Sequence, residues 1–388
     1  MSLFRLALAN LLFRKLSAFI SIVLLLFGVG LVSLLLNANR YLNGSMLNSI
    51  QGVDMVIGAK GSPMQLILAN IYHIDNPTGN ISQQQVDGLL RNPMIQTSVK
   101  LSYGDYYKQF RVLGVSPSFY TFYQLACERG RIGQQAMEVV IGPVVAEESG
   151  LNVGDHFESS HGEGNGEAHH TDYVVTGILK TTGQVTDRLI ITPLQSIWEV
   201  HGGQGKNEED RQITAVLVKF RSPMGLLTVP GMINKNTSLM AALPAIEVNR
   251  LLTLFDSVFE LLYILSVAIV FIAVLSVFFS LLNALRERKF ELALLRLQGA
   301  PRLKLFTLIT LEALLIALLG SIPGVFLGKI GFAVIATTYG GANYVLSENL
   351  LGVDLYLIPV SMCIAFVAAF IPAISAYRIS INQLLKEK

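Results

Sequence analysis

Four long apolar stretches constrain this chain more than any other feature of its sequence. An α-helix needs roughly 20 largely apolar residues to cross a hydrocarbon layer about 30 Å thick. The four stretches cover residues 17–36, 258–283, 305–332 and 355–375. The composition agrees with membrane insertion, because 14% of the 388 residues are charged, against about 25% in a soluble protein. We therefore predict a membrane protein with four transmembrane helices.

The first stretch is predicted to stay in the mature protein as an anchor. Its apolar part is longer than the roughly 7–15 residues of a secretory signal. An amphipathic segment, 1–16, precedes it in place of a short basic tip. We expect that segment to form an interfacial helix on the cytoplasmic side.

The distribution of Lys and Arg predicts the orientation, since cytoplasmic loops carry an excess of both. Basic residues precede the first span, fill the link 284–304 and recur in the tail 376–388, whereas the loop 333–354 has no Lys or Arg. Both termini are therefore expected in the cytoplasm of a bacterium with the chain in its inner membrane. Residues 37–257 and the loop 333–354 would then be periplasmic.

Residues 37–257 are numerous enough to form a domain with its own core. Short runs rich in Val and Ile, such as 110–115 and 138–141, are bounded by Gly, Pro or Asp and alternate with helical patterns. This is the signature of strands, and we predict a mixed α+β domain. A polar stretch, 159–172, is predicted to be a surface insertion between two strands.

Four of the six histidines lie in or near that insertion, with several carboxylates among them. They are His156, His161, His169 and His170. Imidazole and carboxylate ligands suit zinc, but the fixed spacing of a closed zinc site is absent. A weak zinc-binding loop and a solvated loop without a ligand both remain open.

The link 284–304 carries an amphipathic pattern. Phe290, Leu294 and Leu297 are spaced to share one face of a helix, and Gly299 is placed to end that helix. Such a helix can lie on the bilayer surface or dock into a groove of a partner. The spacing does not decide between the two.

Inside the third stretch, Glu312 is a carboxylate in a costly environment. It is either functional or a hydrogen-bonded acid that fixes helix packing. Gly320, Gly324 and Gly328 form a ridge of small residues that permits close helix approach, for packing within the chain or for dimer contact.

The link closely resembles the cytoplasmic motif of FtsX-like permeases, in the MacB and LolC/LolE superfamily of ABC transporters, also called type VII or mechanotransmission systems. The matching residues are Glu287, Arg288, Glu291, Leu292, Ala293, Arg296, Gly299 and Ala300. Asn10, Leu11, Arg14 and Lys15 resemble the family's interfacial helix, and Glu312 with the three glycines resembles its third span. The resemblance is strong at both ends of the chain and weak across 37–257.

The resemblance implies a MacB-like periplasmic core domain and a dimer of permeases, identical or different, over ATPase subunits of LolD or MacB type. Those partners would bind ATP and Mg²⁺, and their closure would move the periplasmic domain. The residues expected to couple to the ATPase are Glu287, Arg288, Phe290, Glu291, Leu294, Arg296 and Gly299. Unlike MacB itself, the chain has no G-x-x-x-x-G-K-[ST] motif; we expect a stand-alone permease that is not an enzyme.

The leading function is export or extraction of a substrate, with a metal link suggested by permeases that carry similar His-rich insertions. The alternative is a signal transmitter that activates or recruits a periplasmic partner. Membrane lipids and a periplasmic adaptor or substrate-binding protein are the further partners expected. A net charge of +2 gives no reason to expect a nucleic acid. Cys127 and Cys363 would lie at different levels and stay unpaired.

Overall fold

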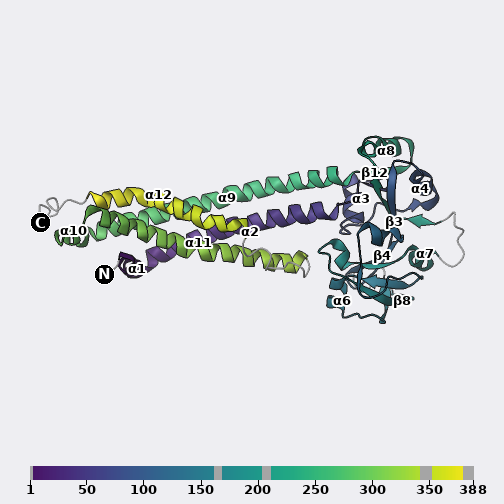
Figure 1. Ribbon diagram of the computed structural model, residues 1–388, viewed down its shortest axis with the longest axis horizontal. Helices are drawn as coiled ribbons and strands as arrows, with labels where there is room; N and C mark the ends of the chain where they lie inside the picture. The colour runs from purple at the N-terminus through teal and green to yellow at the C-terminus, as the bar shows by residue number, and fades with distance from the viewer. Residues whose placement is uncertain (1–2, 161–167, 203–210, 341–351, 379–388) are drawn as a thin grey trace. The chain divides into compact units, whose positions relative to one another are not determined.

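The computed structural model describes residues 3–160, 168–202, 211–340 and 352–378. It divides into a helical unit, Met1–Leu42 with Phe255–Lys388, and an α/β unit, Asn43–Leu254 (Figure 1). The helices that contribute to the helical unit are α1 (Leu3–Phe13), α2 (Lys15–Ser49), α9 (Pro244–Glu287), α10 (Lys289–Leu297), α11 (Arg302–Gly340) and α12 (Leu357–Tyr377), with a 3-10 turn at Val353–Tyr356.

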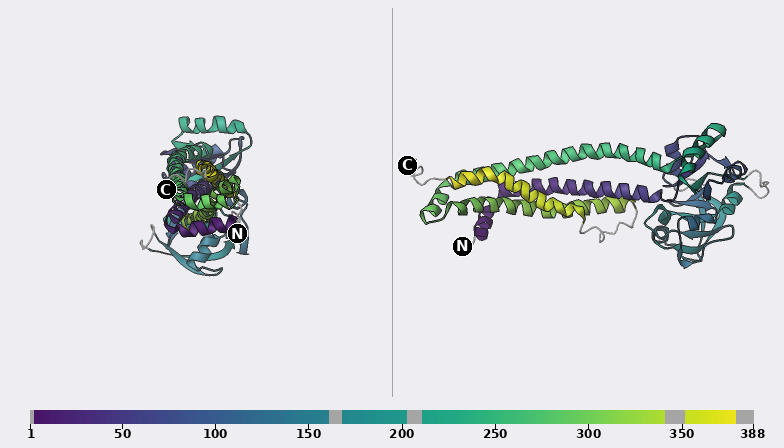
Figure 2. Two further views of the ribbon diagram at one scale, coloured as in Figure 1. Left: turned by 90° about the vertical axis from the view of Figure 1, so that its left-hand side faces the viewer. Right: turned by 45° about the horizontal axis from the view of Figure 1, so that its top comes forward.

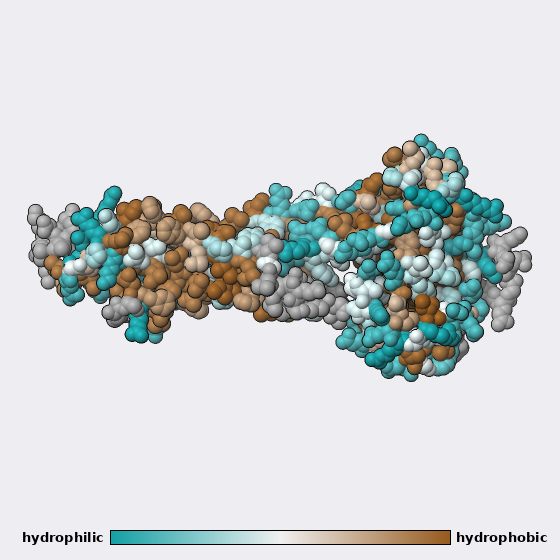
Figure 3. All heavy atoms as spheres, viewed as in Figure 1, coloured by the Kyte–Doolittle hydropathy of each residue, from teal (hydrophilic) through white to brown (hydrophobic). Residues whose placement is uncertain are grey.

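The four predicted spans lie within four helices that are long and apolar enough to cross a membrane, which are Lys15–Ser49, Pro244–Glu287, Arg302–Thr337 and Asp354–Tyr377. Apolar residues dominate the surface of these helices over much of their length (Figure 3). An apolar surface of this extent is stable only against lipid or another protein. The predicted class of membrane protein with four transmembrane helices is confirmed.

The helices extend past the apolar stretches that predicted them. Helix α2 continues to Ser49, and α9 begins at Pro244. Helix α11 runs on to Gly340, so the segment 333–354 begins as helix, where a loop was predicted. A helix satisfies its own backbone hydrogen bonds and need not end where the membrane does. Hydropathy therefore marks the membrane-buried part of each helix and not its ends.

Small residues let the helices of the helical unit approach closely. On α12, Ala365, Ala369, Ala373 and Ala376 are buried, and α12 packs along α11. The two helices lie side by side in both views of Figure 2 and in Figure 1. Leucines of α9, α10 and α11 complete this core, among them Leu281, Leu292 and Leu308.

The described part of the α/β unit is built on a ten-stranded mixed sheet. Its strands are β1 (Met55–Ala59), β3 (Ile95–Tyr107), β4 (Phe110–Val115), β5 (Cys127–Gly130), β6 (Glu138–Ile141), β7 (His156–Ser160), β8 (Ala168–Leu179), β9 (Ile190–Pro193), β11 (Ala215–Phe220) and β12 (Leu239–Ala242). The order is β12-β1-β11-β3-β4-β9-β6-β8-β5, and β7 pairs with β3 and β8. The β4–β9 and β6–β8 pairs are parallel. A small second sheet joins β2 (Ile81–Ser82) to β10 (Gln212–Ile213).

Both faces of the central strands are buried. On β1, Val56 belongs to one apolar core, and Met55 and Ile57 belong to another. Because successive side chains of a strand point to opposite faces, such strands read as continuous apolar runs. The helices of the unit are α3 (Pro63–Asn70), α4 (Gln83–Leu90), α5 (Ser118–Phe122), α6 (Pro143–Ser149), α7 (Leu194–Gly202) and α8 (Pro223–Asn236), with a 3-10 turn at Val185–Arg188. The predicted mixed α+β domain is confirmed.

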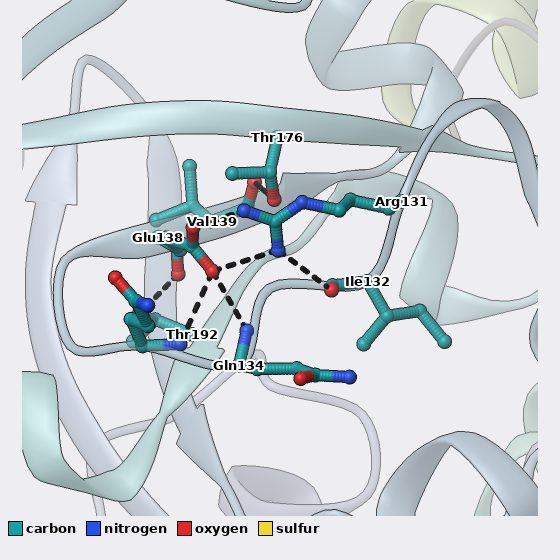
Figure 4. A network of polar contacts seen from close by, with 8 residues as sticks. Arg131, Ile132, Gln134, Glu138, Val139, Thr176 and Thr192 are labelled. Atoms are coloured by element: carbon teal, nitrogen blue, oxygen red, sulfur yellow. Dashed lines mark hydrogen bonds and ion pairs between the residues drawn. The ribbon is translucent and has the colours of Figure 1, made fainter.

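A carboxylate holds the turn between β5 and β6. Glu138 accepts hydrogen bonds from the guanidinium of Arg131 and from the backbone N–H groups of Gln134 and Gln135 (Figure 4). These donors, the Arg131 side chain foremost, lower the pKa of Glu138 to about 2. The turn is thereby fixed next to the edge strand β5.

Candidate functional site

The predicted helix of the link is present as α10, which is separated from α9 by a break at Arg288. It ends at Leu297, and Gly299 follows with φ +91°. Only glycine adopts this conformation without strain, so the predicted helix end at Gly299 is confirmed. Since Pro301 follows, α11 starts afresh at Arg302.

Helix α10 presents its predicted apolar face outward. Phe290 is 63% exposed, Leu294 42% and Leu297 61%. The opposite side of the helix packs into the helical unit through Leu292 and Ala293, which are buried. An exposed apolar face on so short a helix needs a covering surface. We call Phe290, Leu294 and Leu297 the α10 face.

Beside α10, an ion pair joins the start of α2 to the end of α9. The Arg14 guanidinium donates two hydrogen bonds to the Glu287 carboxylate, at 2.9 Å from Nε and 2.8 Å from Nη2. Its Nη1 donates to the carbonyl of Ser280 at 2.7 Å. This fork geometry fixes direction as well as distance. Arg14 therefore positions Glu287, one of the predicted coupling residues.

A second polar cluster joins three segments around Glu312. The Asn10 amide donates to the Glu312 carboxylate at 2.5 Å, and Arg288 Nη1 lies 3.8 Å from the same oxygen. Arg288 Nη2 also donates to the Asn10 carbonyl at 3.1 Å. Glu312 is 3% exposed, and its contacts support the interpretation of an acid that fixes packing. The cluster places predicted residues from the link and from the third span in one contact.

Of the predicted coupling residues, Glu287 and Arg288 belong to these two clusters. Glu291 is exposed at the border of the α10 face, and Arg296 is half-buried. Sequence reasoning singled out Glu287, Arg288 and Glu312 but not their geometry. Their contacts with Asn10 and Arg14 join residues far apart in the chain, which spacing alone does not reveal.

The glycine ridge of α11 packs against α2 of the same chain. A Cβ at Gly324 would lie 2.8 Å from the Leu26 carbonyl oxygen, and one at Gly320 would lie 2.7 Å from the Leu25 Cβ. At Gly328 it would meet the Gly30 carbonyl oxygen even more closely. The structure thus assigns the ridge to packing within the chain.

At the Gly340 end of α11, the structure shows a buried ion pair that sequence reasoning missed. Lys329 Nζ lies 3.2 Å from the carboxylate of Asp354, and the two side chains are 9% and 2% exposed. The Ser33 hydroxyl and the Asn37 amide of α2 donate to the other carboxylate oxygen, at 2.9 and 3.3 Å. A lysine inside a predicted span is costly, and that signal was available at Lys329.

Helices α2 and α9 are joined near the α10 end by the hydroxyl pairs Ser17–Ser280 and Ser21–Ser276, at 2.7 and 2.9 Å. Further along, a groove of about 490 Å³ lies between them. It is lined by Asn39, Asp256, Phe259, Glu260, Tyr263, Ile264 and Val267. The two helices are thus joined by hydroxyl pairs at one end, and Tyr263 of α9 contacts Asn39 of α2 beside the groove.

Of the histidines predicted to bind metal, His156 is the one whose side chain the structure describes. Its Nδ1 lies 2.6 Å from the Asp172 carboxylate on an exposed part of β7 and β8. His161 and the side chains of His169 and His170 lie outside the described residues. Residues 159–160 and 168–172 belong to strands β7 and β8, so the predicted insertion is in part strand. In the described part of the chain, no group of three metal-ligating side chains occurs.

Comparisons with known proteins cover both units. Residues 18–226 match the family model of the MacB-like periplasmic core domain, and residues 263–388 match that of the FtsX-like permease C-terminal. The search of curated proteins gave no match.

Among solved structures, the periplasmic region of MacB from Actinobacillus actinomycetemcomitans is similar, at 12% identity over 53% of this chain and 97% of that chain, with a TM-score of 0.36. The extracellular domain of the ABC-type transporter YknZ from Gram-positive bacteria is similar at 14% identity over 48% of this chain and 98% of that chain, with a TM-score of 0.33.

Proposed function

Because the chain belongs to the family of FtsX-like ABC transporter permeases with a MacB-like periplasmic core domain, we propose that it converts ATP hydrolysis by a separate subunit into movement of its periplasmic domain. The movement exports or extracts a substrate. Members of this family are integral membrane permease components that lack ATPase motifs and work with an ABC ATPase.

The exposed α10 face carries the proposal. Phe290, Leu294 and Leu297 form an apolar strip that fits a groove on a partner, as an amphipathic helix does in many complexes. Its other side is fixed to the helical unit by Leu292 and Ala293. A push on α10 is therefore transmitted directly into the helices. The proposed partner is an ATPase of LolD or MacB type that binds ATP and Mg²⁺. Because such a partner acts in the cytoplasm, the proposal includes a cytoplasmic location for α10 and for both termini.

The two polar clusters beside α10 determine which helices move when α10 is displaced. Arg288 directly precedes α10 and contacts Asn10 of α1 and Glu312 of α11. Glu287 is one residue earlier and contacts Arg14. Movement of α10 thus reaches α1, α2 and α11 through directed contacts. Two permease copies, identical or different, would be needed to match two ATPase subunits.

Substitution of the α10 face tests the proposal. In the variant Leu294→Glu, a charge enters the strip, and we expect the ATPase to be lost from the complex purified from membranes while the permease still inserts. Gln298→Ala, at an exposed position just past the helix, is the matched control. Retention of the ATPase by the Leu294 variant at the control level would contradict the docking role.

Signal transmission to a periplasmic partner uses the same coupling and differs in what the periplasmic domain contacts. A periplasmic enzyme cross-linked to residues of the α/β unit in intact cells would favour this alternative. A periplasmic adaptor or substrate-binding protein would favour transport.

A further inference from the structure

Helix α11 (Arg302–Gly340) carries one buried charge in each of its halves. Glu312 lies in the half of α11 that is nearer to α10. Lys329 lies 17 residues later, which is about 26 Å along a helix. Each is paired with a charge from another segment, Glu312 with Arg288 and Lys329 with Asp354. The coupling described above explains the first pair. It gives no role to the second.

Asp354 lies where three segments meet. It belongs to the 3-10 turn that leads into α12. Its carboxylate forms an ion pair with Lys329 of α11 and accepts hydrogen bonds from Ser33 and Asn37 of α2. The two side chains of the pair are almost fully buried. Burying both charges has a large desolvation cost, which only good geometry and further hydrogen bonds offset. A buried ion pair of this kind adds little net stability, and a role in fixing the relative position of the helices explains it better.

Other contacts at this end also join α11 to α2. The rings of Tyr41 and Phe332 meet edge to face with centroids 5.6 Å apart, a favourable arrangement. Gly328 contacts the Gly30 backbone. Helix α2 then continues without a break to Ser49. The groove beside Asn39 lies between α2 and α9 over the same stretch, and Tyr263 of α9 contacts Asn39 of α2 there.

We propose that Lys329 and Asp354 are positioning residues whose ion pair holds α11 and α12 against α2 at the end remote from α10. We call this ion pair the clasp. With the clasp closed, α2, α11 and α12 move as one body. A push on α10 then travels along α2, while α9 changes its distance from α2 across the groove. This inference rests on the proposed coupling function and adds to it which helices move together.

Neutral replacement of both partners tests the clasp. Truncating one partner would leave a buried charge alone and could unfold the protein. In Lys329→Met/Asp354→Asn the shapes are kept, and the Asn carbonyl still accepts from Ser33 and Asn37. The half-buried pair Lys100–Asp87, 2.6 Å apart in the α/β unit, supplies the matched control Lys100→Met/Asp87→Asn.

Spin labels measure the distances from α2 to α11 and from α2 to α9. In a Cys127→Ser/Cys363→Ser background, labels at Arg40→Cys and Ile330→Cys span α2 and α11, and labels at Arg40→Cys and Leu261→Cys span α2 and α9. All three positions are exposed. Complexes with the ATPase are assembled with an excess of unlabelled permease, so that each contains one labelled copy. Distances are measured by pulsed electron resonance without nucleotide and with ATP and vanadate.

We expect a single narrow 40–330 distance in the unsubstituted pair and in the Lys100/Asp87 control, with or without nucleotide. In the Lys329/Asp354 variant a second, longer distance should appear, even without nucleotide. A narrow, unchanged 40–330 distance in that variant would overturn the clasp, and so would a nucleotide-dependent shift of this distance with the pair intact.

The 40–261 distance tests the coupling function separately. It should change with nucleotide while the clasp is intact. If it stays constant although the complex hydrolyses ATP, both the coupling function and the division of the helices into a fixed and a moving group fail. The nucleotide-free 40–330 comparison still decides whether the ion pair holds α11 to α2.

Discussion

Arg14 and Glu287 lie 273 positions apart in the chain, yet their side chains form a two-pronged ion pair. The same guanidinium donates to the Ser280 carbonyl at 2.7 Å. The pair joins the start of α2 to the last residue of α9, next to α10. Of the two partners, Arg14 is largely buried, whereas the Glu287 side chain is 61% exposed.

This asymmetry predicts unequal effects of removing each partner. Glu287→Ala should cost at most about 1 kcal/mol of stability, because exposed ion pairs contribute little. Arg14→Ala should cost more, since it also leaves the Ser280 carbonyl without this donor. Thermal unfolding of the purified permease, followed by size-exclusion chromatography after heating, measures both. Equal losses, or a larger loss for Glu287→Ala, would contradict the assigned contacts.

The contact between α11 and α2 predicts that methyl groups on the glycine ridge are not tolerated. Gly324→Ala would place its Cβ 2.8 Å from the Leu26 carbonyl oxygen, and backbone cannot move aside as a side chain can. We expect a loss of about 1–3 kcal/mol, typical of overpacking, as a lower unfolding temperature in the same assay.

Gly231→Ala on α8 is the matched control for the ridge. A Cβ there meets nothing within 4 Å, and alanine favours a helix over glycine by up to about 1 kcal/mol. The control should be neutral or stabilising. A tolerated Gly324→Ala would show that the helices lie further apart than the structure has them.

The sequence predicted the spans, the α10 helix and the class of the α/β unit because these depend on local patterns. Periodicity identifies Phe290, Leu294 and Leu297 as one face, and the left-handed φ of Gly299 follows from its place after the helix. Runs such as Phe110–Val115 predict strands because both faces of the sheet are buried.

What the sequence could not supply depends on contacts between distant residues. Glu312 is recognisable as a buried acid, but its partners Asn10 and Arg288 come from other segments. Lys329 is recognisable as a charge inside the predicted span 305–332, although the apolar residues around it keep the average hydropathy of the span high. Its partner Asp354 lies beyond 341–351, in a stretch without periodicity.

The histidines near β7 and β8 predict that the protein binds Zn²⁺, which a titration tests. Because imidazole and carboxylate suit zinc, we expect the full-length permease to bind Zn²⁺ and the variant His161→Ala/His169→Ala/His170→Ala to lose that binding in isothermal calorimetry. His156→Ala tests whether the residue paired with Asp172 contributes. Equal heats from the unsubstituted chain and the triple variant would contradict zinc binding by these histidines.

His73 predicts how the stability of the α/β unit depends on pH. Its Nδ1 lies 2.6 Å from the Tyr103 hydroxyl. Burial, reinforced by the charge of Arg111, lowers the pKa of His73 to about 3. The folded protein therefore keeps this ring neutral at pH 5, whereas the unfolded chain takes up a proton as the pH falls through about 6.5. Above that pH, His73 has no effect on how the free energy of unfolding depends on pH. Below it, the free energy of unfolding falls, by about 2 kcal/mol at pH 5.

The variant His73→Asn removes the titrating group while keeping a residue that tolerates the positive φ of this position, +56°. Trp198, the chain's single tryptophan, lies in the α/β unit and reports its unfolding by fluorescence. Between pH 7 and 5 the stability of the unsubstituted protein should fall more steeply than that of the variant. Glu138 does not interfere, since its lowered pKa affects stability only as the pH falls below about 4.5. Parallel curves over this range would mean that the folded protein also takes up a proton at His73, which contradicts its lowered pKa.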